Sequence, residues 1–96
     1  MATTSATTAT ADNASDVVVA KNGERVYLRI SVVTADEVAY LNIGGAAVVG
    51  SGIRLAYGGE PFELNITGDY DNWKAGAVYA ITTGPDVVLA IFEVTR

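Results

Sequence analysis

The sequence contains no cysteine and no histidine. Without cysteine the chain cannot form a disulfide framework or a thiolate zinc site, and without histidine it lacks the commonest general base and the commonest metal ligand. Carboxylate pairs and serine–lysine arrangements are the familiar catalytic groups that are left. We therefore predict a protein that is not an enzyme, with no catalytic residue, no cofactor and no metal site.

Positive charge is also scarce. Six Lys and Arg residues stand against eleven Asp and Glu residues in 96 residues, which gives a formal net charge of −5. The cations are scattered along the chain, whereas phosphate binding needs them clustered, and the acidity disfavours an anionic membrane surface. The longest apolar run, residues 87–92, is far too short to cross a bilayer. We expect neither a nucleic-acid partner nor a membrane partner.

The N-terminal segment has almost no side chains that could form a core. Residues 2–11 read ATTSATTATA, with no charge, no aromatic residue and no hydrophobic period. Such a segment cannot bury enough apolar surface to offset the entropy lost on ordering. We therefore divide the chain into an extended low-complexity arm, residues 1–14, and a β-sandwich domain, residues 15–96. The arm is expected to become ordered only on neighbouring chains, with Thr3, Thr4, Thr7 and Thr8 as its contact residues.

The remainder of the chain has the pattern of short strands. In residues 25–33, Val26, Leu28 and Ile30 alternate with other side chains at a period of two, which places one face inward. Turn residues separate similar segments, and no window has a helical period. Strands are expected at 17–20, 25–33, 38–43, 46–49, 53–57, 62–66, 76–82 and 87–95. The fold class is therefore all-β, a small sandwich or jelly-roll-like barrel of about seven or eight antiparallel strands.

Two of the turns suggest hairpins. Asn22 and Gly23 form the dipeptide most typical of a two-residue hairpin, between the segments 17–20 and 25–33. Residues 83–86 contain Gly and Pro, and we expect them to join the last two strands as a second hairpin.

A polar loop at residues 69–73 is a candidate binding site. Asp69 and Asp71 can act as paired oxygen ligands for an ion or simply as solvated turn residues, and we assign them to the turn. Tyr70 and Trp73 each have an apolar body and a polar tip, so they can anchor a partner or stack on a sugar. The alternative for Trp73 is that it covers one open end of the sandwich.

Two segments resemble a class of structural proteins of tailed bacteriophages. They are residues 51–64 (SGIRLAYGGEPFEL) and residues 76–94 (GAVYAITTGPDVVLAIFEV). The resemblance implies a virion component assembled in the host cytoplasm, such as a capsid decoration protein, a head-fibre protein or a tail adaptor. Its partners would be the major capsid protein or neighbouring head or tail subunits.

Half of the residues are hydrophobic, more than a domain of this size can bury alone. The sequence therefore predicts a non-enzymatic homo-oligomeric structural protein that docks on neighbouring subunits through its N-terminal arm, by main-chain hydrogen bonds. The alternative function is a carbohydrate- or receptor-binding module that uses Asp69, Tyr70, Asp71 and Trp73.

Overall fold

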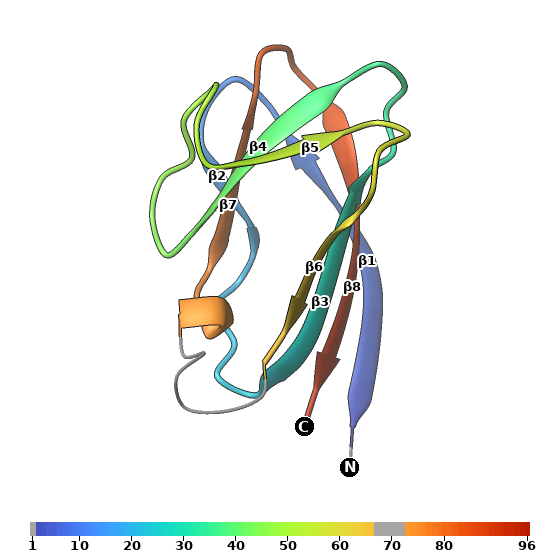
Figure 1. Ribbon diagram of the computed structural model, residues 1–96, viewed down its shortest axis with the longest axis vertical. Coiled ribbons are helices and arrows are strands. Elements are labelled where there is room, and N and C mark those ends of the chain that lie inside the picture. The colour runs from blue at the N-terminus through green and yellow to red at the C-terminus, as the bar shows by residue number, and fades with distance from the viewer. Residues whose placement is uncertain (1, 67–72) are drawn as a thin grey trace.

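Two four-stranded antiparallel sheets pack face to face in the computed structural model, which describes residues 2–66 and 73–96 (Figure 1). The first sheet has the order β1 (Thr3–Ala11), β8 (Val87–Thr95), β3 (Arg25–Val32), β6 (Phe62–Asn65). The second sheet has the order β2 (Asp16–Val19), β7 (Val78–Thr82), β4 (Val38–Ile43), β5 (Ile53–Ala56). This is the strand order of a jelly roll, so the predicted all-β class is confirmed.

The core lies between the two sheets and follows the predicted alternation. Leu28 and Ile30 of β3 are fully buried, whereas Arg29 between them is exposed. In β8, Val87, Leu89 and Ile91 point inward in the same way. A slip of one residue would turn these side chains to the solvent, so the register of both strands is fixed by burial.

The N-terminal segment is a strand of the chain's own first sheet. Residues 3–11 pair with β8 in nine consecutive antiparallel pairs, from Thr3 opposite Thr95 to Ala11 opposite Val87. The expectation that this segment finds order only on a neighbouring chain is therefore wrong, because β8 supplies main-chain partners that side-chain composition does not reveal. The division into residues 1–14 and 15–96 stays a prediction, since the pairing does not show whether the remainder folds without β1.

Neither of the two predicted hairpins forms. β2 belongs to the second sheet and β3 to the first, so the turn at Asn22 and Gly23 carries the chain across the sandwich. That turn is closed by the Asn22 side chain, whose Oδ1 accepts a hydrogen bond from the Glu24 N–H at 3.0 Å. The turn at residues 83–86 likewise joins β7 to β8 across the two sheets. Turn chemistry identified where the chain reverses, but not which sheet it enters next.

The strand expected at residues 46–49 is a loop in the structure. The N–H of Ala47 donates to Ser15 Oγ at 2.8 Å instead of to a strand, and Val48 and Val49 are exposed. This loop joins β4 and β5, which do form an antiparallel pair. At its end Gly52 has φ +79° and lies so close to the Leu41 carbonyl that a Cβ would be 2.8 Å from its oxygen, so only glycine fits.

Helical structure in the described ranges is limited to a 3₁₀ turn at residues 73–75. No helix there is long and apolar enough to cross a membrane. The 3₁₀ turn lies at the end of the sandwich that also holds the two chain termini (Figure 1).

Candidate functional site

The outer edge of β1 is the largest open strand edge in the described part of the chain. β1 is the first strand in the order of its sheet, so only one of its two edges is paired, with β8 (Figure 1). The pairing has nine residues and no register shift, so no bulge interrupts β1 along its opposite edge. Such an edge presents a row of N–H and C=O groups that a second chain can pair with.

Natural sheets usually protect their edges with short strands, charged side chains, proline or bulges. The other three edge strands, β6, β2 and β5, have four residues each. In addition, β6 follows Pro61 and carries Glu63, β5 carries Arg54, and β2 has a register shift between Val17 and Val19. β1 has none of these protections, since its nine residues are Thr, Ser and Ala alone.

β1 contributes very little to the core. Of its nine side chains only that of Ala11 is buried, that of Ala9 is half-buried, and the other seven are exposed. Side chains from residue 3 to residue 8 are exposed on both faces of the strand, so neither face is covered along that stretch. The strand is therefore held almost entirely by its main-chain pairing with β8.

The four threonines that we predicted as contact residues all lie in β1. Thr4 and Thr8 stand opposite Val94 and Ala90, whereas Thr3 and Thr7 stand opposite Thr95 and Ile91. The structure thus places all four on one exposed strand, with alternate members on opposite faces. Their role in binding a partner stays a prediction.

The outer face of the first sheet carries a small polar and aromatic cluster beside β1. Tyr27 packs edge-to-face against Phe92 at 6.1 Å between ring centroids, and the Arg29 guanidinium lies 5.6 Å from the Phe92 ring centre. The Tyr27 hydroxyl donates a hydrogen bond to the Glu63 carboxylate. This hydrogen bond raises the pKa of Tyr27 above its ordinary value, and burial and the negative charge of Glu63 add smaller effects in the same direction.

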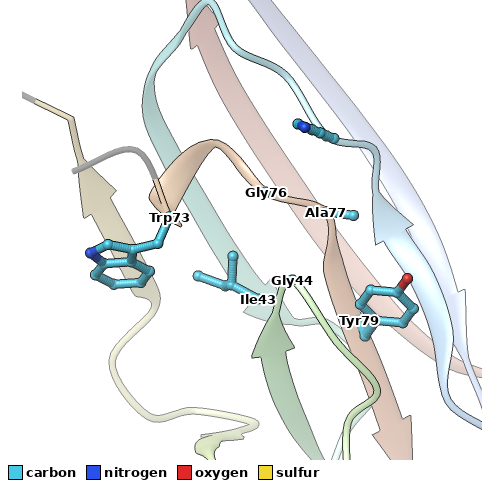
Figure 2. A pocket seen from close by; sticks show the side chains of 7 residues that line it. Ile43, Gly44, Trp73, Gly76, Ala77 and Tyr79 are labelled. Atoms are coloured by element: carbon cyan, nitrogen blue, oxygen red, sulfur yellow. The ribbon is translucent and has the colours of Figure 1, made fainter. Parts of the chain in front are cut away.

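A second candidate site is an open pocket of about 390 Å³ at the end of the sandwich that holds the 3₁₀ turn. Figure 2 shows Trp73 and Tyr79 on opposite sides of the pocket, with Ile43 and Gly44 between them. Gly76 also lines the pocket, and a Cβ at this position would lie 3.3 Å from the Ile43 side chain. Aromatic side chains on two sides of an open pocket suit the stacking of a ring.

Only one residue of the predicted polar loop can be placed in this site. Trp73 is 57% exposed, so it does not cover the open end of the sandwich. The Lys74 ammonium lies 5.6 Å from its ring centre, and the same ammonium donates to the Asn65 carbonyl at 2.9 Å. Asp69, Tyr70 and Asp71 lie outside the described residues.

Arg25, and not Trp73, closes this end of the sandwich. Its side chain is fully buried, and its Nε forms an ion pair with Glu93 Oε2 at 2.7 Å. The two terminal nitrogens donate to the carbonyls of Lys74, Gly76 and Ala20 at 2.7, 3.0 and 2.8 Å. One guanidinium therefore joins both sheets and the 3₁₀ turn at this end of the sandwich.

Strict alternation along β3 would have placed Arg25 on the outer face with Arg29. The pairing with β8 shifts register between Arg25 and Tyr27, and this bulge turns the Arg25 side chain inward. Sequence reasoning missed the contact because it cannot detect a bulge. One signal was available, since Glu93 falls on the inward side of the last strand, where a carboxylate needs a partner.

No family model matches the chain, and no curated protein sequence does either. Among solved structures, the chain is similar to a protein from Bacillus endospore appendages, which are described as a novel family of disulfide-linked pili. The TM-score is 0.60 at 16% sequence identity, over 98% of this chain and 84% of that chain. At this identity the likeness shows a shared fold.

The phage assignment is corrected by this comparison. The structural similarity is to a bacterial appendage protein, so the predicted bacteriophage family, the capsid decoration role and the virion location are wrong. Two segments suggested phage proteins. Residues 51–64 contain β5 and most of β6, and residues 76–94 contain β7 and most of β8, each with the connection between its two strands. They are features of a jelly-roll fold, which unrelated proteins share.

The Arg25 contacts predict a large loss of stability when the guanidinium is removed. Arg25→Met should lower the free energy of unfolding by about 3–5 kcal/mol, because Glu93 then loses its buried partner and three carbonyls lose their donor. Urea denaturation followed by circular dichroism measures this cost. Arg29→Met is the matched control, since Arg29 is exposed, and should cost less than about 1 kcal/mol. Equal costs for the two variants would contradict the stabilising role of Arg25.

Proposed function

We propose that this protein is a non-enzymatic structural subunit that assembles with copies of itself into a polymer, and that β1 forms the contact between copies. The observation that carries the proposal is the nine-residue edge of β1, which has no charge, proline or bulge and is open on one side. A strand of this kind pairs readily with another chain, and such pairing is normally prevented in proteins that stay monomeric.

Two further observations support assembly. The similar fold of the Bacillus appendage protein occurs in a pilus, which is a polymer of subunits. Several large apolar side chains also remain exposed on this chain, in addition to the edge of β1. They are Val17, Val33, Val48, Val49, Tyr57 and Trp73. Contacts between copies would remove such side chains from water.

A disulfide cannot join copies of this chain. The Bacillus appendages are described as disulfide-linked, but the present chain contains no cysteine. Main-chain pairing is the alternative that β1 offers, because its side chains provide little apolar surface or charge.

Carbohydrate binding is a second candidate function, and the exposed Trp73 beside the pocket favours it. Trp73 is the only tryptophan of the chain, so its fluorescence reports on this site alone. If the pocket holds a sugar ring, titration with a binding saccharide will shift the emission, and Tyr79→Ala will abolish the shift. A panel of saccharides that leaves the emission unchanged would reject this function and leave the assembly proposal intact.

The assembly proposal predicts polymers whose formation depends on the main chain of β1. Sedimentation velocity over a concentration series should show species growing beyond the 10.0 kDa chain. The double variant Thr7→Pro, Thr8→Pro should assemble much less, because adjacent N–H groups of a strand point to opposite edges and both donors are lost. Near-ultraviolet circular dichroism checks that its core is still packed.

The matched control is Thr7→Ser, Thr8→Ser, which keeps both N–H groups and should assemble like the unchanged protein. The proposal is wrong if the unchanged protein is a monomer at every concentration. It is equally wrong if the proline variant assembles as well as the serine variant.

A further inference from the structure

β1 is held in its sheet almost entirely by main-chain pairing with β8, so it can be exchanged between copies. We propose that copies exchange β1, so that β1 of one copy leaves its own sheet and pairs with β8 of the next copy. This inference rests on the proposed function and specifies how the contact forms. It differs from simple addition of strands at the outer edge of β1, in which β1 would keep its own β8 as a partner.

The first argument is that β1 has few side-chain contacts to lose. Release from its own sheet exposes the methyl groups of Ala9 and Ala11, since the other seven side chains are exposed already. The neighbouring strands β8 and β3 bury Leu, Ile and Val side chains instead. β1 is therefore the strand of the first sheet that can leave with the least loss of apolar burial.

The second argument is that every copy offers the same acceptor. After β1 leaves, the vacated edge of β8 can form the same nine pairs with β1 of another copy, including the position of Ala11 beside Val87. The exchanged junction thus regains the native contacts in full. Strand addition at the outer edge would gain only main-chain hydrogen bonds, because the side chains of β1 are small and exposed.

The third argument concerns the connection between β1 and β2. Residues 12–15 carry the chain from the first sheet to the second, and they can serve as the hinge. Their contacts are few: the Asp12 carbonyl accepts from the Thr82 N–H at 2.8 Å, and Asp12 Oδ1 accepts from the Ala14 N–H at 2.9 Å. The Ser15 hydroxyl accepts from the Ala47 N–H.

A released β1 is long enough to reach a neighbour. Nine extended residues span about 30 Å. The molecule measures 38 × 23 × 19 Å, so the strand extends beyond the narrower dimensions of its own domain. Each copy donates one strand and accepts one strand, which is a head-to-tail contact that generates chains or rings.

Locking β1 onto its own β8 tests this inference directly. Thr8 and Ala90 are cross-strand partners, and such partners have Cα atoms about 4.5–5.5 Å apart, within the range of a disulfide. The double variant Thr8→Cys, Ala90→Cys, oxidised as a dilute monomer, should remain monomeric when concentrated. The same variant with reductant present should assemble like the unchanged protein.

The outcomes separate this inference from the proposed function. If the oxidised variant assembles as well as the reduced one, β1 does not need to leave its sheet, so exchange is wrong while assembly through β1 stands. If the reduced variant and the unchanged protein both stay monomeric, the proposed function is wrong and the exchange falls with it.

A second measurement detects the exchanged pairing itself. A size-tagged Thr8→Cys copy is assembled with an untagged Ala90→Cys copy and then oxidised. Exchange brings these positions of different chains together, so a disulfide between the tagged and untagged chains should form. In the control, an Arg54→Cys copy takes the place of the Ala90→Cys copy. Arg54 is exposed on the second sheet, so no disulfide between the tagged and untagged chains should form. Absence of the first product in assembled material would overturn the inference.

Discussion

The buried guanidinium of Arg25 is the contact on which one end of the sandwich depends. It binds Glu93 of β8 and three main-chain carbonyls from the two connections that close this end. A buried charge is stable only when its donors are satisfied, so these segments are fixed relative to one another by a single side chain. β8 is thereby attached to β3 through an ion pair in addition to the strand pairing.

The opposite side of β8 has no comparable attachment within the described part of the chain. β1 pairs with it along nine residues, but contributes only two alanine side chains to the interior. The first sheet therefore has one side fixed by side chains and one side held by main-chain hydrogen bonds. This asymmetry explains why a strand without protection at its edge can serve as the junction between copies while the remaining three strands of the sheet stay in place.

The sequence was sufficient to predict the strands that carry an alternating hydrophobic pattern, such as β3 with Leu28 and Ile30. β1 could not be predicted in this way, because its order comes from the main chain of β8, and Thr and Ala side chains carry no signal of that pairing. The inward position of Arg25 results from a bulge, which leaves no trace in residue type. Among the candidate binding residues, Trp73 lies exposed, so the alternative in which it covers the end of the sandwich is wrong; its polar surroundings in the sequence left both positions open.

Amide hydrogen exchange, followed residue by residue by nuclear magnetic resonance, tests the separability of β1 most directly. In dilute monomer the amides of residues 3–11 should exchange much faster than those of β3, because β1 can open without unfolding the domain. After assembly the same amides should become as protected as those of β3. If β1 and β3 exchanged at the same rate in the monomer, β1 would open only with global unfolding, and its role as a separable strand would be contradicted.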